Sequence, residues 1–204
     1  TARAIAAGVE LRLHANATAE EVLALGPDAV VLATGAAMMR PEGLDGEGRD
    51  LRAVVAGGVP AGGLDALLDA DATPATYDAA ELIAARFRRL VLLTPREAIA
   101  RDSPVIVAQG IHRRLAALGV EVRTCTDAVA CRGGEVTMRH VLTGAEEVIR
   151  GVDLFTYSSA RVPRDGLAAP LRAAGIPVRL VGDALAPRLM LSAVREGQAA
   201  GEAA

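Results

Sequence analysis

The sequence predicts an α/β fold, in which helices connect the strands of parallel sheets, with a small antiparallel meander. Three observations predict it. The apolar run Ala29–Ala33 has no polar alternation, which is typical of a parallel strand covered on both faces. The strand Leu64–Asp71, a helix that starts at Pro74 and the strand in "RLVLLTP" form a strand–helix–strand unit with parallel strands. Alternation returns around Gly133 and Gly134, a pair that favours a tight hairpin turn.

The first elements follow from local signals. Thr1–Ala7 is rich in alanine and predicts a helix, which the next residue, a glycine, would end. Val9–Leu13 alternates apolar and charged residues, as a half-exposed strand does. Within Asn16–Leu25, Thr18 and Glu21 have the spacing of a capping box and predict a short helix.

The later elements are separated by glycine and proline. The stretch Ala36–Gly63 is long and has little periodicity, which is typical of a functional or inter-domain connection. Further elements are expected in this order: a helix capped by Thr73 that runs to about Arg88, a helix over Pro104–Leu118, a helix over Gly166–Ala174, and a strand, a glycine–aspartate corner and an amphipathic helix over Val178–Gly197.

Composition excludes several function classes. The 204 residues are 51% hydrophobic, enough for one large domain or two small ones. A net charge of -3 without a clustered basic face argues against nucleic acid, and no apolar run reaches the roughly 18 residues of a membrane span. Cys125 and Cys131 lack CxxC or zinc-site spacing, so we expect two reduced thiols and a cytoplasmic location. Because the sequence opens in mid-element, we expect a truncated chain.

Two segments far apart in the sequence predict one cofactor site. "VVLATGA" and "LVGDALAP" are each an apolar strand that ends in glycine, and the carboxyl ends of parallel strands are where nucleotides bind. In the first segment, Ala33 and Gly35 allow close approach of a ligand and Thr34 offers a hydroxyl. In the second, Gly182 admits a ligand, Asp183 can accept hydrogen bonds from sugar hydroxyls, and amides of the following helix would face anionic groups. Alone, each segment is equally compatible with a tight turn.

The order of these segments, with a strand–helix–strand insertion between them, resembles that of flavoproteins with two dinucleotide-binding domains. Within that group the chain resembles the C-terminal region of the trimethylamine dehydrogenase and 2,4-dienoyl-CoA reductase (NADH:flavin oxidoreductase) family. The residues that carry the resemblance are Gly8–Ala36, Leu92–Ala100 and Val181–Gly197. It implies a Rossmann-like fold of the FAD/NAD(P)-binding type. A partial FAD- or ADP-binding domain would comprise residues 1–50 and 151–204, and an inserted NAD(P)-binding-like domain residues 51–150.

The resemblance implies an oxidoreductase built of more parts than this chain. Family members combine an FMN barrel and a cysteine-rich iron–sulfur segment with these two domains, so FMN and a 4Fe-4S cluster are expected only in a full-length protein. Two cysteines cannot supply four cluster ligands. The partners of this chain would be the N-terminal barrel and a glycine-rich strand–turn–helix of the same protein. The full enzyme would act on a small-molecule substrate, and a homodimer is an expected alternative to a monomer. Alone, this chain should hold half of an FAD or ADP site and catalyse nothing.

The inserted domain lacks the glycine fingerprint of a dinucleotide site. No glycine lies between Asp69 and Ala80, and Asp69 and Asp71 place negative charge where a phosphate would bind. Two explanations are open: the aspartates hold a metal, or Asp71 and Thr73 cap the next helix. The second is favoured, because no third ligand is near in sequence. Loss of dinucleotide binding is, as the resemblance implies, how the trimethylamine dehydrogenase branch differs from the reductase branch.

Other residues and functions are less favoured. The three histidines lie in separate elements without partners at ligand spacing, and Tyr157 and Ser158 are expected to pack after a strand, although contact with a cofactor edge remains an alternative. A non-catalytic structural or interaction module with a vestigial nucleotide site is the alternative function. A self-sufficient NAD(P)-dependent reductase is disfavoured by "DADATPAT".

Overall fold

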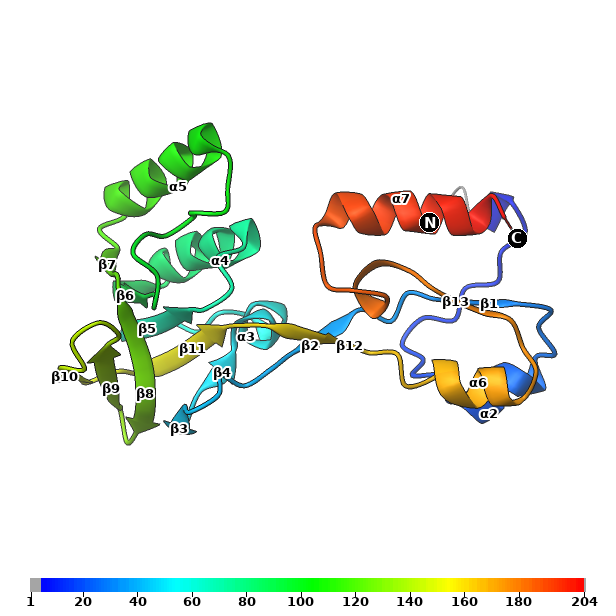
Figure 1. Cartoon of the computed structure of the whole chain (residues 1–204), viewed down its shortest axis with the longest axis horizontal. Helices are drawn as coiled ribbons and strands as arrows, with labels where there is room; N and C mark the ends of the chain where they lie inside the picture. Colours follow the sequence, from blue (N-terminus) through cyan, green and yellow to red (C-terminus); the bar gives the residue numbers. More distant parts are fainter. Residues whose placement is uncertain (1–4, 204) are drawn as a thin grey trace. The chain divides into compact units, whose positions relative to one another are not determined.

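The computed structural model describes residues 5–203 and divides the chain into two compact units (Figure 1). The first comprises Thr1–Ala37 and Val162–Ala204, and the second, Met38–Arg161, interrupts it. The sequence placed these boundaries at 50/51 and 150/151. They lie elsewhere because residues outside 51–150 belong to the sheet of the second unit. Strand β11 (Leu154–Ser158) pairs with β5 (Gly62–Asp69) on one side and with β4 (Arg49–Asp50) on the other.

The first unit is built on two parallel strands, β1 (Val30–Leu32) and β13 (Val178–Leu180). Two short helices, α2 (Ala19–Ala24) and α6 (Ala168–Ala173), pack their apolar residues against one face of these strands. Helix α7 (Met190–Gly201) lies on the opposite side of the strands (Figure 1). The unit is therefore a small three-layer α/β arrangement.

The elements predicted for the start of the chain are confirmed only in part. The capping box is present, because the Glu21 amide donates to the Thr18 hydroxyl and the Thr18 amide donates to the Glu21 carboxylate. The predicted strand Val9–Leu13 is wrong: these residues are exposed and irregular, since no strand among residues 5–203 pairs with them. The helix predicted over Thr1–Ala7 lies largely outside the described residues. Strand β1 is present but covered less than predicted, because Val31 is 45% exposed.

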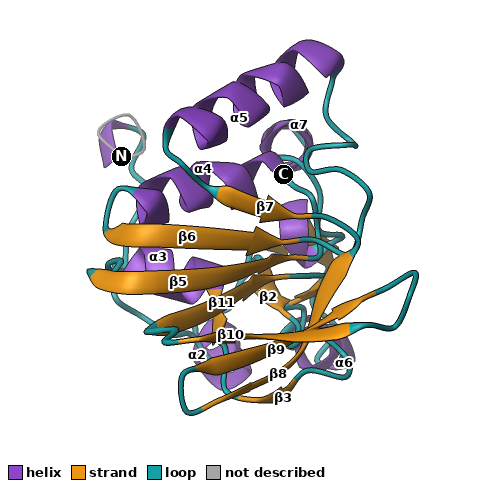
Figure 2. Cartoon of the chain, turned by 90° about the vertical axis from the view of Figure 1, so that its left-hand side faces the viewer, coloured by secondary structure: helices purple, strands orange, loops and turns teal. Residues whose placement is uncertain are grey.

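The second unit contains a five-stranded sheet whose paired strands all run parallel (Figure 2). The predicted parallel strand–helix–strand unit is confirmed, with β5 and β6 side by side. Helix α4 ends at Ala84 instead of Arg88, because strand β6 begins at Phe87. The sheet order is β4 (Arg49–Asp50), β11, β5, β6 (Phe87–Leu93) and β7 (Glu121–Arg123), and the helices are α3 (Leu51–Gly57), α4 (Pro74–Ala84) and α5 (Val105–Ala117).

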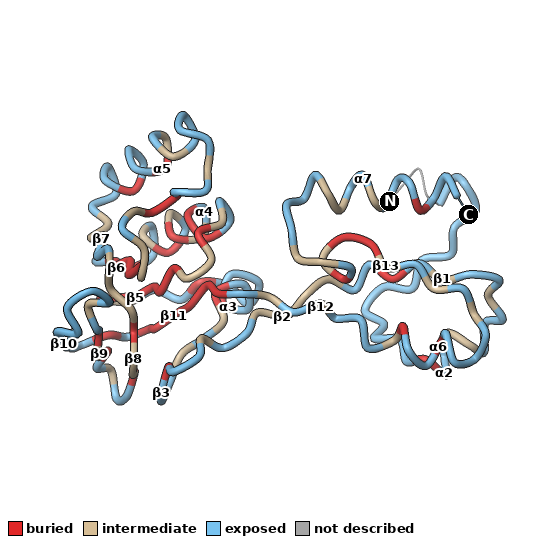
Figure 3. The backbone as a smooth tube through the Cα atoms, viewed as in Figure 1, coloured by how far each residue is buried: buried red, intermediate tan, exposed pale blue. Residues whose placement is uncertain are grey.

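The two faces of this sheet are buried against different layers. One face packs on the three helices, with Leu67 and Leu92 among its contacts. The other packs on the predicted antiparallel meander, with Leu68 and Val91 among its contacts. Figure 3 shows the buried residues following the central strands. The meander comprises β8 (Thr126–Arg132), β9 (Glu135–His140) and β10 (Glu146–Arg150), and β3 (Asp45–Gly46) joins its edge.

The hairpin between β8 and β9 turns at the predicted glycine pair. Gly133 and Gly134 have φ values of 55° and 77°, the left-handed conformation that a two-residue hairpin turn requires. The chain passes between the units at β2 (Ala36–Met38) and β12 (Arg161–Pro163), which are hydrogen-bonded neighbours in a sheet of their own. Within residues 5–203, no helix has the length and apolar character needed to cross a membrane.

One ionisable side chain interrupts the apolar core between sheet and helices. Asp65, on β5, is fully buried, and neither of its carboxyl oxygens has a hydrogen-bond partner among the described residues. Burial raises the pKa of this carboxyl to about 8, a shift that the nearby Thr156 hydroxyl only moderates. Asp65 is therefore protonated in the folded protein at neutral pH.

Candidate nucleotide-binding edge

The structure brings the two predicted segments together. Strands β1 and β13 are parallel neighbours, with Leu32 opposite Leu180, and the Val181 amide donates to the Leu32 carbonyl at 3.0 Å. Gly35 and Gly182 therefore follow adjacent strands at the same, carboxyl, end of one sheet. This is the arrangement that a shared nucleotide site at these two segments requires.

The first segment leaves open space beside its glycine. Gly35 has φ +74°, and a Cβ built on it would meet no atom within 4 Å. Ala33 and Thr34 are exposed. The Thr34 hydroxyl donates to the Arg164 carbonyl, and the Arg164 amide donates to the Gly35 carbonyl at 2.9 Å. Thr34 thus fixes the position of the backbone at Arg164, where the chain re-enters the first unit. Ala33 and Gly35 form the surface that a ligand could reach.

The second segment is packed more tightly. Gly182 has φ +61°, and a Cβ on it would lie 3.1 Å from the Ala193 Cβ, so this glycine allows α7 to pack closely. Its amide donates to the Glu196 carboxylate at 2.7 Å, and the Arg188 guanidinium pairs with the same carboxylate. The Arg188 amide donates to Asp183 Oδ1 at 3.0 Å. The Gly182 amide therefore already faces an anionic group of the chain.

The helix expected directly after this corner begins later. A short 3₁₀ turn spans Gly182–Ala184, and α7 starts only at Met190. The prediction that amides of the following helix face a ligand at the corner was therefore wrong in its placement. Pro187 lies between the two and cannot donate a backbone hydrogen bond.

In the second unit, the corresponding strand end is filled by carboxylates. Asp69 accepts from the Ala72 amide at 2.8 Å and from the Tyr77 hydroxyl at 2.7 Å. Asp71 accepts from the Thr73 amide at 3.1 Å and from the Thr76 hydroxyl at 2.7 Å. The two carboxylates therefore occupy the Ala72 and Thr73 amides in the turn that leads into α4, and they place negative charge where a pyrophosphate would lie.

This network is buried and was not foreseen from the sequence. Tyr77 is fully buried, and its hydroxyl also accepts from the Ala100 amide at 2.6 Å. Burial raises the pKa of Asp69, and burial together with the Asp69 charge raises the pKa of Tyr77. Neither predicted cap is present. Asp71 accepts from the Thr73 amide, which precedes α4, and from the Thr76 hydroxyl, and Thr73 makes no side-chain cap bond.

The remaining sequence candidates are placed as follows. Tyr157 and Ser158 lie in strand β11 itself and are buried, not in a loop after it. No group of three or more metal-ligating side chains occurs in the described part of the chain, and Asp69 and Asp71 have no third ligand there. Cys125 and Cys131 are free thiols, half-buried and buried.

Solved structures resemble the chain over most of its length, whereas no family model matches it. Histamine dehydrogenase from Rhizobium sp. 4-9 matches 91% of this chain with 27% identity and a TM-score of 0.77. 2-Naphthoyl-CoA reductase matches 96% with 21% identity and a TM-score of 0.82, and Lactococcus lactis thioredoxin reductase matches 86% with 18% identity and a TM-score of 0.68. The chain spans 32%, 30% and 64% of these proteins, respectively.

These matches confirm two predictions. The resemblance to the trimethylamine dehydrogenase and 2,4-dienoyl-CoA reductase family is confirmed by the histamine dehydrogenase structure, which is 27% identical. The Rossmann-like α/β fold is confirmed by this structure and by those of 2-naphthoyl-CoA reductase and thioredoxin reductase.

Proposed function

We propose that this chain, a relative of the trimethylamine dehydrogenase and 2,4-dienoyl-CoA reductase family, is the C-terminal nucleotide-binding part of a larger flavin- and iron–sulfur-dependent oxidoreductase. The whole enzyme would be amine dehydrogenase-like or NADH:flavin oxidoreductase-like and would act on a small molecule. The names of the matched proteins support this class of reaction, and the chain's coverage of about a third of two of them supports the larger size. This chain alone would not be catalytic.

The observation that carries the proposal is the pairing of β1 with β13. It puts Gly35 and Gly182 at the same end of one sheet, where an adenine nucleotide (FAD or ADP) would lie across both strand ends. The open space at Gly35 fits the close approach of such a group. Ala33 and Thr34 would pack against the nucleotide, and Asp183 would accept hydrogen bonds from its sugar hydroxyls.

The fit is that of half a site. The Gly182 amide is bonded to Glu196, so a phosphate at this corner would have to displace that carboxylate or take its amides from elsewhere. We propose that a glycine-rich strand–turn–helix from the remainder of the protein supplies those amides. FMN and the 4Fe-4S cluster would be held by other parts of the full-length protein. At this edge the chain would only bind the adenine nucleotide of FAD or ADP.

Nucleotide binding by the full-length protein tests the proposal. Gly35→Ala should weaken ADP or FAD binding at least about tenfold, because its Cβ would occupy the open space. Gly151→Ala is the matched control: Gly151 also has φ +74° and open space around its Cβ, but it lies in the second unit. Both substitutions introduce the same backbone strain, so a difference in affinity between the two variants reports the nucleotide site itself. Isothermal titration calorimetry with ADP or FAD measures this difference. Equal affinities for the two variants would overturn the site.

The second candidate is a structural or interaction module with a vestigial site. It is favoured by the internal bonds of Thr34 to Arg164 and of Gly182 to Glu196, which leave fewer groups for a ligand. The same titration decides between the two, because this candidate expects no saturable nucleotide binding in the unsubstituted full-length protein.

A further inference from the structure

Strand β10 ends the sheet of the antiparallel meander, and its outer edge is unpaired. The sheet order is β10, β9, β8 and β3, so no strand among the described residues follows β10. The other terminal strands of the second unit, β3, β4 and β7, have only two or three residues, whereas β10 has five. An edge strand of this length is a template for pairing with another chain. It lies outside the proposed nucleotide site.

Every second residue of β10 directs its backbone hydrogen-bonding groups away from β9. The His140 amide donates to the Ala145 carbonyl at 2.8 Å, so Ala145 and every second residue after it face β9. The register with β9 continues without a shift to the end of the strand. The amides and carbonyls of Glu146, Val148 and Arg150 are therefore directed at the open edge.

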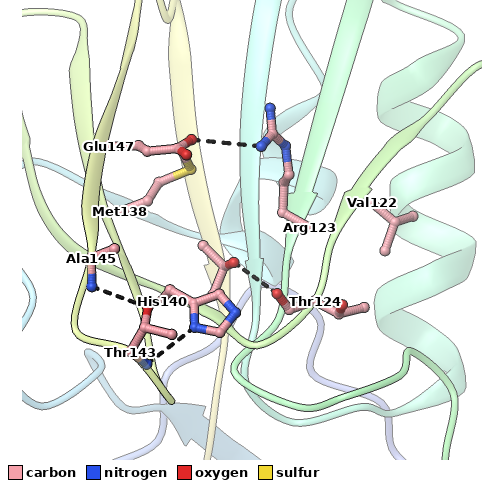
Figure 4. Close-up of a pocket in the computed structure, with 9 residues that line it drawn as sticks. Val122, Arg123, Thr124, Met138, His140, Thr143, Ala145 and Glu147 are labelled. Carbon is pink, nitrogen blue, oxygen red and sulfur yellow. Dashed lines mark hydrogen bonds and ion pairs between the residues drawn. The ribbon is translucent and has the colours of Figure 1, made fainter.

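The side chains of β10 alternate between the two faces of the meander. Ile149 packs against the core, and Glu147 points towards Arg123 of β7, 3.6 Å away (Figure 4). The side chains of the first, third and fifth residues lie on the opposite face and are exposed, with Val148 at 39%. The residues with outward backbone groups are therefore also those with exposed side chains.

The exposed side chains of β10 have opposite charges at its two ends. Glu146 pairs with Arg139 at 2.8 Å, and Arg150 pairs with Glu135 at 3.1 Å. Arg139 donates to Oε1 of Glu146, and Arg150 donates to Glu135 through its Nε. Within the described residues, Oε2 of Glu146 and the terminal nitrogens of Arg150 therefore remain open to a further partner. A strand that is negative at its start and positive at its end is complementary to its own antiparallel copy.

We propose that β10 pairs antiparallel with β10 of a second copy of this chain, around a two-fold axis at Val148. In this register, Glu146 lies opposite Arg150 of the second copy at both ends of the pair. The three outward residues of each strand form hydrogen-bonded pairs, so every free amide and carbonyl at the edge gains a partner. Residues directly opposite in such a pair have Cβ atoms about 5 Å apart, within reach of an ion pair.

Sedimentation velocity of the full chain at increasing protein concentration measures the association. A single strand pair makes a narrow interface, so we expect a weak dimer that forms as the concentration rises. Glu146→Arg places two positive charges opposite each other at both ends of the pair, and Arg150→Glu places two negative charges there. Each variant alone should therefore dimerise at least about tenfold more weakly.

An equal mixture of these two variants tests the register of the pairing. One copy then carries arginine at both ends of β10 and the other carries glutamate at both ends, so opposite charges face each other again. The mixture should regain dimers that contain one copy of each variant, which native mass spectrometry identifies by their mass. A defect in folding would not be repaired by mixing.

Val148→Pro tests the backbone of the edge. Proline removes an outward amide that β9 does not use, so the dimer should be lost while the meander is retained. Val148→Thr is the matched control, because threonine is equally β-branched and keeps the amide. Circular dichroism checks that all variants fold. The pairing is overturned by a chain that stays monomeric at every concentration, by single charge variants that associate like the original chain, by a mixture that does not recover, or by equal association of Val148→Pro and Val148→Thr.

Discussion

Replacing Asp65 by asparagine should remove most of the pH dependence of unfolding between pH 5 and 7.5. The carboxyl is buried without a hydrogen-bond partner and has a pKa of about 8 in the folded protein, against 3.8 for an unperturbed aspartate. Between these values the unfolded chain loses a proton that the folded protein keeps. Stability therefore falls as the pH rises, by at most about 1.4 kcal/mol per pH unit, and levels off above pH 8.

Urea unfolding followed by circular dichroism at several pH values measures this effect. An asparagine side chain has nearly the same size as an aspartate but cannot ionise, so the variant should gain about 3 kcal/mol over the original protein between pH 5 and 7.5. Some slope should remain, because burial also raises the pKa of Asp69. Parallel curves for the two proteins would show that Asp65 does not titrate as proposed.

Asp153→Asn gives a control of opposite sign. The Gly63 and Leu64 amides donate to the Asp153 carboxylate and lower its pKa. Its contribution to stability is present above the unfolded pKa and is lost as the pH falls through the folded value. This variant should therefore be less stable at neutral pH, and it should retain the decline of stability towards pH 8.

Replacing Tyr77 by phenylalanine should destabilise the second unit by about 3 kcal/mol, because two buried polar groups lose a partner. The hydroxyl donates to Asp69 and accepts from the Ala100 amide, and all three residues are fully buried. Ala100 has φ +55°, an unfavourable conformation that this hydrogen bond helps to hold. The aromatic ring itself is unchanged, so the loss measures the hydroxyl.

Native-state hydrogen exchange of the amides in β5 and β6 reports the stability of this unit. Tyr157→Phe is the matched control, because Tyr157 is the only other tyrosine and is also buried. No hydrogen bond of the Tyr157 hydroxyl occurs within the described residues, so its loss should cost under about 1 kcal/mol. Equal effects of the two substitutions would contradict the role given to the Tyr77 hydroxyl.

The sequence predicted the parts of the fold that depend on local or strongly patterned signals. The capping box at Thr18, the apolar strand β5 and the glycine-pair hairpin each carry their cause within a few residues. The strand predicted over Val9–Leu13 failed for a different reason. Alternation reports which face is apolar, but a strand also needs a neighbour for its backbone groups, and the described residues provide none there.

The pairing of the two strand ends was predicted from the sequence, but the hydrogen bonds around them were not. The strand ends at Gly35 and Gly182 could be paired from their pattern, because carboxyl ends of parallel strands share an edge. The bond from Gly182 to Glu196 joins residues on either side of a turn whose length the sequence did not reveal. The partnerless Asp65 was also invisible, since an aspartate in a strand pattern gives no sign of which layer will cover it.

The two crossings between the units have a consequence for how such a chain could arise. Strands β2 and β12 are hydrogen-bonded neighbours, so the backbone leaves the first unit and re-enters it at points about 5 Å apart. Because the two ends of the inserted segment are adjacent, its insertion costs the first unit little chain entropy. The segment from Met38 to Arg161 could therefore be excised and its flanks rejoined by a short linker, or a different guest fold grafted in its place.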